Sequence, residues 1–158
     1  MKKILLNGGW LVVIPMVFNV AFFRQLPRAF SAEIFWKDIP AIISYPENIL
    51  RIAIFAAPFG MRIELGRIRG LVLYAIGMLV YMACWLVAMF QKEGAFLHSG
   101  IGFTSPAYTS ELWLAGIGFS TASYFGPEVR VRSVYVASTL AFVVFHTWHT
   151  YHVFSKLA

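Results

Sequence analysis

The stretch GLVLYAIGMLVYMACWLVAMF, residues 70–90, decides the fold class, because none of its 21 residues carries a formal charge. About 20 consecutive apolar residues suffice for a helix that crosses a bilayer. The composition agrees: 59% of the 158 residues are hydrophobic, 13% are charged, and the mean hydropathy is +0.72. Soluble domains carry about 25% charged residues. We therefore expect an all-α integral membrane protein.

Four further apolar segments predict a bundle of five transmembrane helices in a single transmembrane domain, residues 1–158. These segments are residues 4–23, 39–60, 107–125 and 133–154. Ser44-Tyr-Pro-Glu47 matches a capping box, which predicts that the regular second helix starts near Tyr45. A re-entrant or kinked segment near residues 40–60 would leave four spans, and this alternative stays open. Residues 27–37 mix apolar and charged side chains, which predicts a short interfacial helix, and residues 91–106 are predicted to form a polar loop.

Lysine and arginine residues indicate the orientation of the predicted helices. Seven lie on the inside if the N-terminus is inside: Lys2, Lys3, Arg62, Arg67, Arg69, Arg130 and Arg132. Five lie outside: Arg24, Arg28, Lys37, Lys92 and Lys156. The excess favours an N-terminus inside and a C-terminus outside, in a bacterial-type inner (plasma) membrane.

The formal charge of +6 is explained by basic residues that fix this topology and contact anionic lipid at the inner face of the bilayer. We expect no nucleic-acid partner, because the basic residues lie between apolar runs. Arg62, Arg67 and Arg69 are the candidates for contact with a lipid phosphate.

Three histidines near the end of the last predicted helix are the most specific chemical feature. His146, His149 and His152 recur at i, i+3 and i+6, which keeps them on one side of a helix. Neutral imidazole is the commonest metal ligand, so these residues and His98 are candidate ligands of a transition metal or of haem iron. A proton relay uses the same side chains. The structural alternative is that they complement the helix dipole at the membrane interface.

A polar cluster interrupts the predicted span 39–60 at Glu47, Asn48 and Arg51. Ionisable side chains inside a span are costly and usually face the protein interior or water. Glu47 and Arg51 are four residues apart, an order that lets them pair on a helix. Glu111 opens the fourth predicted helix on the same side, so we expect an outer polar cavity that also includes the first two histidines of the motif. The alternative is a capping glutamate paired with a structural arginine.

Small residues in the fourth predicted helix recur at four-residue spacing, as Gly116 with Ser120 and Gly118 with Ala122. This spacing permits close backbone approach. It predicts that the helix packs centrally, or against a partner that is another membrane protein or a second copy of the chain.

The sequence carries no Walker A, H-E-x-x-H, G-x-S-x-G or G-x-G-x-x-G motif, so it does not decide whether the chain is an enzyme. The leading hypothesis is a small membrane protein with a metal-, haem- or proton-handling His/Glu site near the outer face. The alternatives are a non-catalytic accessory or scaffold subunit of a membrane complex, and a lipid-modifying membrane enzyme.

Overall fold

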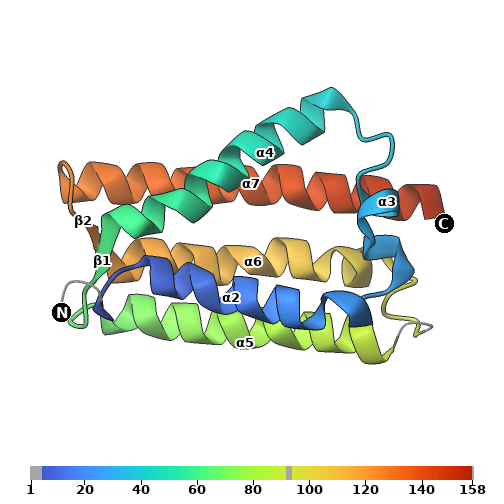
Figure 1. Cartoon of the computed structure of the whole chain (residues 1–158), viewed down its shortest axis with the longest axis horizontal. Coiled ribbons are helices and arrows are strands. Elements are labelled where there is room, and N and C mark those ends of the chain that lie inside the picture. The colour runs from blue at the N-terminus through green and yellow to red at the C-terminus, as the bar shows by residue number, and fades with distance from the viewer. Residues whose placement is uncertain (1–4, 92–93, 158) are drawn as a thin grey trace.

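Helices that run back and forth along the long axis form most of the molecule (Figure 1). The computed structural model describes residues 5–91 and 94–157. Five of the helices in this part of the chain have 14 or more residues: α2 (Gly9–Phe22), α4 (Ala41–Ala56), α5 (Ile68–Phe90), α6 (Gly100–Ser120) and α7 (Glu128–Leu157). The expected all-α class is confirmed, since 79% of the structure is helical. Lys2, Lys3, the predicted first helical residue Ile4, and Lys92 lie outside the described residues.

Short elements join the long helices at the two ends of the bundle. At one end lie η1 (Phe23–Gln25), η2 (Arg28–Phe30) and α3 (Ala32–Phe35). At the other end lie η3 (Ala57–Gly60), β1 (Met61–Ile63) and β2 (Thr121–Ser123). The single helix predicted over residues 27–37 is thus replaced by two short turns of helix, because Ser31 between them has an extended backbone.

The start predicted for the second span near Tyr45 is wrong, because α4 begins at Ala41 after Pro40 and includes Pro46. A proline in a helix removes its own N–H bond to the carbonyl four residues earlier, and its ring crowds that same carbonyl. Pro46 lies in the second turn, so the cost falls on a single carbonyl near the helix start. Glu47 therefore belongs to the body of the helix and does not cap it. With η3, the helical segment reaches Gly60.

The ends of α6 and α7 also differ from the prediction. α6 starts at Gly100, within the predicted polar loop, because the Ser99 side chain accepts a hydrogen bond from the Gly102 N–H at 3.0 Å. It ends at Ser120 because residues 121–123 pair with β1 in an antiparallel ladder. α7 starts at Glu128, directly after the turn at Gly126, where φ is 86°.

The first helix begins later than predicted, at Gly9, because the preceding residues are tied to β1. The Gly8 N–H donates to the Met61 carbonyl at 2.9 Å, and Asn7 forms a bridge with Arg62. These bonds and the β1–β2 pairing close one end of the bundle. We call it the arginine end, because it holds Arg62, Arg67, Arg69, Arg130 and Arg132.

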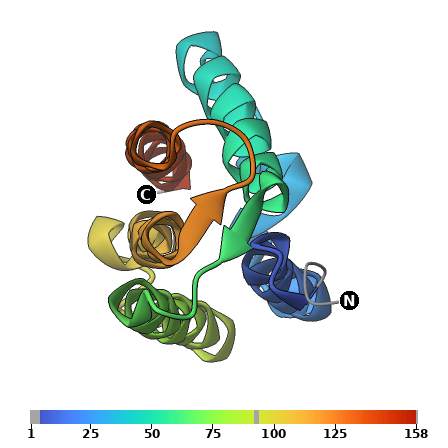
Figure 2. The same cartoon turned by 90° about the vertical axis from the view of Figure 1, so that its left-hand side faces the viewer.

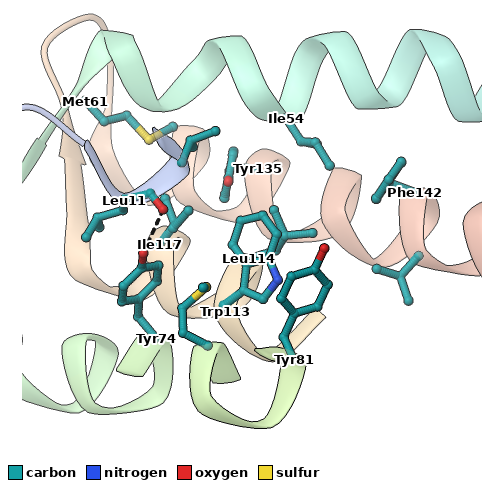
Figure 3. Packing of buried hydrophobic residues seen from close by; sticks show 13 residues of the cluster. Leu11, Ile54, Met61, Tyr74, Tyr81, Trp113, Leu114, Ile117, Tyr135 and Phe142 are labelled. Atoms are coloured by element: carbon teal, nitrogen blue, oxygen red, sulfur yellow. Dashed lines mark hydrogen bonds between the residues drawn. The ribbon is translucent and has the colours of Figure 1, made fainter. Parts of the chain in front are cut away.

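α6 lies between α5 and α7, and α4 packs on α7 (Figure 2). Glycines bring α5 and α6 into backbone contact: a Cβ added at Gly77 would lie 2.4 Å from the Trp113 nitrogen, and one at Gly116 would lie 2.4 Å from the Tyr74 nitrogen. The buried core where these helices meet is drawn in Figure 3, with Leu114, Ile117 and Phe142 among its members.

Large apolar side chains cover much of the outer surface. The exposed fraction is 76% for Val20, 71% for Ile52 and 70% for Leu79. Ile68–Phe90 and Glu128–Leu157 are long and apolar enough to cross a membrane, and only 28% and 22% of their most apolar windows are buried. A core helix of a soluble protein is mostly buried, and large exposed apolar patches are rare on soluble monomers. The surface therefore fits association with a membrane.

Candidate functional site

The carboxylate of Glu47 lies at the contact between α4 and α7, and its side chain is completely buried. Residues three positions apart on a helix share a face, so His146 and His149 of α7 both reach it. The His146 Nδ1 lies 2.8 Å from Glu47 Oε1, and the His149 Nδ1 lies 2.5 Å from Glu47 Oε2. Arg51, one turn further along α4, donates to Oε1 as well. We call these four side chains the Glu47 cluster.

His149 is held between two groups that both accept hydrogen bonds. Its Nε2 lies 2.8 Å from the Phe35 carbonyl of α3, and its side chain is completely buried. A carbonyl can only accept, so Nε2 carries a proton. The bond between Nδ1 and Glu47 Oε2 needs a second proton, which belongs either to the imidazole or to the carboxyl group. The pair therefore holds one proton more than a carboxylate beside a neutral imidazole.

This shared proton sets the charge of the Glu47 cluster. The Glu47–His149 pair is electrically neutral whichever atom holds the proton. Arg51 adds one positive charge, because guanidinium does not deprotonate in proteins. With His146 neutral, the four side chains carry one net positive charge inside the bundle.

Aromatic rings fix Arg51 beside the cluster. Its guanidinium carbon lies 5.0 Å from the centroid of the Trp36 ring and 5.8 Å from that of Phe142. Contacts over ring faces at these distances attract a cation and leave the edges of the planar group free to donate. Nη2 donates to Glu47, and the other guanidinium N–H groups have no hydrogen-bond partner within residues 5–91 and 94–157.

A cavity of about 370 Å³ lies beside Arg51 and His146. Residues of α2, α3, α4, α5, α6 and α7 line it. Aromatic side chains form a large part of its walls: Phe30, Phe35, Trp36, Phe55, Tyr81, Trp85, Trp113 and Phe142. The His146 ring stacks on Phe142 with centroids 5.2 Å apart, and 24% of its side chain is exposed. The cavity thus reaches the buried Glu47–His149 pair through His146.

Comparison with known protein families, characterised proteins and solved structures finds no match to this chain.

The structure brings together only part of the predicted polar cavity. Asn48, the residue after Glu47 on α4, is exposed. Glu111 of α6 lies elsewhere in the bundle, where its Oε1 accepts a hydrogen bond from the Thr139 hydroxyl of α7 at 3.1 Å. Its Oε2 is buried without a partner among the described residues. Glu111 and Asn48 therefore do not belong to the site around Glu47.

The four histidines proposed as metal ligands do not converge. His98 is exposed in the loop before α6, and His152 Nε2 is buried without a hydrogen-bond partner in the described chain. His149 uses both ring nitrogens for protein acceptors. Across residues 5–91 and 94–157 there is no group of three or more His, Cys, Asp or Glu side chains that could hold a metal ion. The four histidines therefore do not form one site in the described residues.

Two of the three arginines predicted to contact a lipid phosphate bind other groups of the protein. Arg62 pairs with Glu64 at 2.6 Å, and Arg67 donates to Glu128 and to the Thr121 carbonyl. Arg69 lies with Arg67 and Arg132 along a cavity of about 420 Å³ at the arginine end. Arg132, which was expected on the same side as these three arginines, lines this cavity, whereas Arg62 does not.

The small residues of the fourth predicted helix face two neighbours. Gly116 packs against Tyr74 of α5, and Gly118 against Val136 of α7. Ser120 is completely buried at the end of α6, whereas Ala122 lies on β2, outside the helix.

Two further residues of the cavity carry polar groups that no local pattern singles out. Asn19 pairs with the Tyr81 hydroxyl at 2.9 Å, which links α2 to α5. The Trp113 side chain is buried, and its Nε1–H has no partner among the described residues. Figure 3 shows this nitrogen turned toward Tyr81, another residue of the cavity wall. The only sequence signals are a polar residue and a tryptophan within apolar runs.

Proposed function

We propose that this protein is an integral membrane protein of five spanning helices that binds a proton at the Glu47–His149 pair and exchanges it through His146. The observation that carries the proposal is the position of His149 between two acceptors, which requires a proton in its bond to Glu47. Buried ionisable groups in membrane helices are costly and usually serve a proton or ligand pathway.

The bundle supports the membrane part of the proposal. α5 and α7 have 23 and 30 residues, which corresponds to about 34 and 45 Å at 1.5 Å per residue and exceeds the roughly 30 Å hydrocarbon core. The shorter α2 and α4 are continued by η1 and η3. We place the arginine end at the inner face, in contact with anionic lipid, with the N-terminus inside and the C-terminus outside.

His146 supplies the route for the proton. In this route the His146 Nδ1, which lies 2.8 Å from Glu47 Oε1, carries the ring proton, and the Nε2 has no partner in the described residues. A proton taken up on Nε2 from the cavity allows the Nδ1 proton to pass to Glu47 Oε1. The carboxyl group can then rotate or pass the other proton to His149, and one proton leaves by the reverse steps through His146 to the cavity. Uptake and release therefore balance, and only O–H and N–H bonds change.

The test is the rate at which the proton of the Glu47–His149 bond exchanges with deuterium. Protein labelled with ¹⁵N in its histidine rings is transferred in micelles into D₂O and followed by NMR. The proposal predicts that His146→Phe, which preserves stacking on Phe142, slows this exchange strongly. His152→Phe, a matched change on the same helix, leaves the rate as it is. Equal rates in the two variants contradict the route through His146.

A further inference from the structure

The polar groups of the cavity offer donors to a ligand. Most of the cavity's hydroxyl protons are already used: Ser110 donates to the Ala107 carbonyl at 2.6 Å, and Thr150 to the His146 carbonyl at 2.8 Å. Asn19 and Tyr81 satisfy each other. The remaining donors of known position in the described residues are the free guanidinium N–H groups of Arg51 and the buried indole N–H groups of Trp85 and Trp113. A buried donor without a partner is costly, so a ligand that brings acceptor oxygens is favoured.

Charge selects among such ligands. The Glu47 cluster carries one net positive charge, and its cation Arg51 is the member whose free edge lines the cavity. Guanidinium pairs with a carboxylate through two parallel hydrogen bonds, a geometry that matches both groups. One net charge is balanced by one monoanion. A carboxylate therefore fits the cavity in both charge and hydrogen bonding.

The remainder of the ligand must be apolar. Apart from the polar groups already named, the walls are aromatic and aliphatic. Met16 and Val20 of α2 line the cavity, and they are 48% and 76% exposed on the outer surface. The mouth of the cavity is thus on the apolar surface that α2 presents to the bilayer. A volume of about 370 Å³ is at the small end of ligand sites, which span roughly 300–1,000 Å³. It accommodates a head group and part of one chain, with the rest extending into lipid.

We propose that this cavity binds a single-chain, long-chain carboxylate from the bilayer, with its head group on Arg51 and its chain passing between α2 and α4. The inference rests on the proposed function, because the net positive charge follows from the proton shared by Glu47 and His149. Its partner is named by chemistry: an anionic head, an apolar tail and entry from the membrane.

Binding of palmitate labelled with ¹³C at its carboxyl carbon tests the assignment. The full chain in neutral detergent micelles is titrated, and the carboxyl resonance is followed by NMR. Palmitamide has the same chain without the charge, and acetate has the head without the chain. We expect palmitate to shift on binding, and palmitamide and acetate to bind much more weakly. Equal binding of palmitate and palmitamide overturns the proposal.

Variants locate the head group. Loss of a charge-assisted contact in Arg51→Gln is expected to weaken palmitate binding roughly 10- to 100-fold. Arg28→Gln, an exposed arginine at the same end of the bundle, is the matched control and leaves binding unchanged. Arg51→Lys keeps the charge and recovers part of the affinity, which separates loss of the contact from misfolding. Equal weakening in Arg51→Gln and Arg28→Gln, or no recovery in Arg51→Lys, refutes a head group on Arg51.

The ring nitrogens of His149 are read by NMR in the same samples. A protonated pair without palmitate binding overturns the ligand assignment and leaves the proposed function standing. A pair without the extra proton overturns the proposed function, whether or not palmitate binds.

Discussion

Replacing His149 by phenylalanine is expected to destabilise the protein by about 3–5 kcal/mol. The ring is kept, so packing on Phe35 and Trp36, at centroid distances of 4.3 and 4.7 Å, persists. Two hydrogen bonds are lost, one of them to a carboxyl group. The change also leaves Glu47 Oε2 and the Phe35 carbonyl buried without a donor. A bond to a charged group contributes about 1.5–3 kcal/mol, and removal of one partner of a buried ion pair costs about 3–5 kcal/mol.

The assay is reversible unfolding in mixed micelles with increasing SDS, followed by tryptophan fluorescence and circular dichroism. His152→Phe is the matched control, because it makes the same change one turn away at a ring whose buried Nε2 has no partner among the described residues. We expect this control to change the free energy of unfolding by less than about 1 kcal/mol. Adding Glu47→Leu to His149→Phe removes the orphaned carboxyl and restores part of the stability. Equal losses in the two single variants would refute the reasoning.

Three further predictions concern the packing that positions the site. Gly77→Ala should lower the free energy of unfolding by about 1–3 kcal/mol, because its Cβ would lie 2.4 Å from the backbone of Trp113; Gly66→Ala, with open space around it, should not. Asn19→Leu should lower the free energy of unfolding by about 1 kcal/mol, because the Tyr81 hydroxyl loses its hydrogen-bond partner. Asn48→Leu, at an exposed position, should leave the free energy of unfolding unchanged. Arg67→Gln should loosen the arginine end by removing its bonds to Glu128 and the Thr121 carbonyl, measured as faster amide exchange in β2, with exposed Arg130→Gln as the control. If the control variant of a pair has the larger effect, the contact assigned to the test variant is contradicted.

The helices could be predicted from hydropathy because apolar runs are local features of the chain. Their ends could not, because tertiary contacts decide them. α6 stops at Ser120 because the next residues pair with β1, about 60 positions earlier in the chain. α2 starts at Gly9 because Gly8 is bonded to Met61. Pro46 is the instructive error: its position within a capping-box pattern predicted a helix start, yet the packing of Glu47 on α7 places both residues inside α4.

Part of the candidate site could be predicted from the sequence, as two pairs of polar residues. The spacing of Glu47 with Arg51, and of His146 with His149, indicated two polar pairs on helix faces. The predicted topology placed the two pairs on the same side, and the packing of α4 on α7 brings them into contact. The Phe35 carbonyl, which decides the proton count at His149, is a backbone group in a short turn of helix and has no sequence signature. Glu111 was expected at the site because it lies on the same side of the predicted topology. Helix packing instead places it against Thr139.

The most direct test of the central claim is ring ¹⁵N NMR of His149 in the wild-type protein at neutral pH, with the signal assigned by its absence from His149→Phe. The account predicts a protonated Nε2 and a proton in the hydrogen bond between Nδ1 and Glu47. A His149 ring with an unprotonated Nε2, or with no proton between Nδ1 and Glu47, would contradict it.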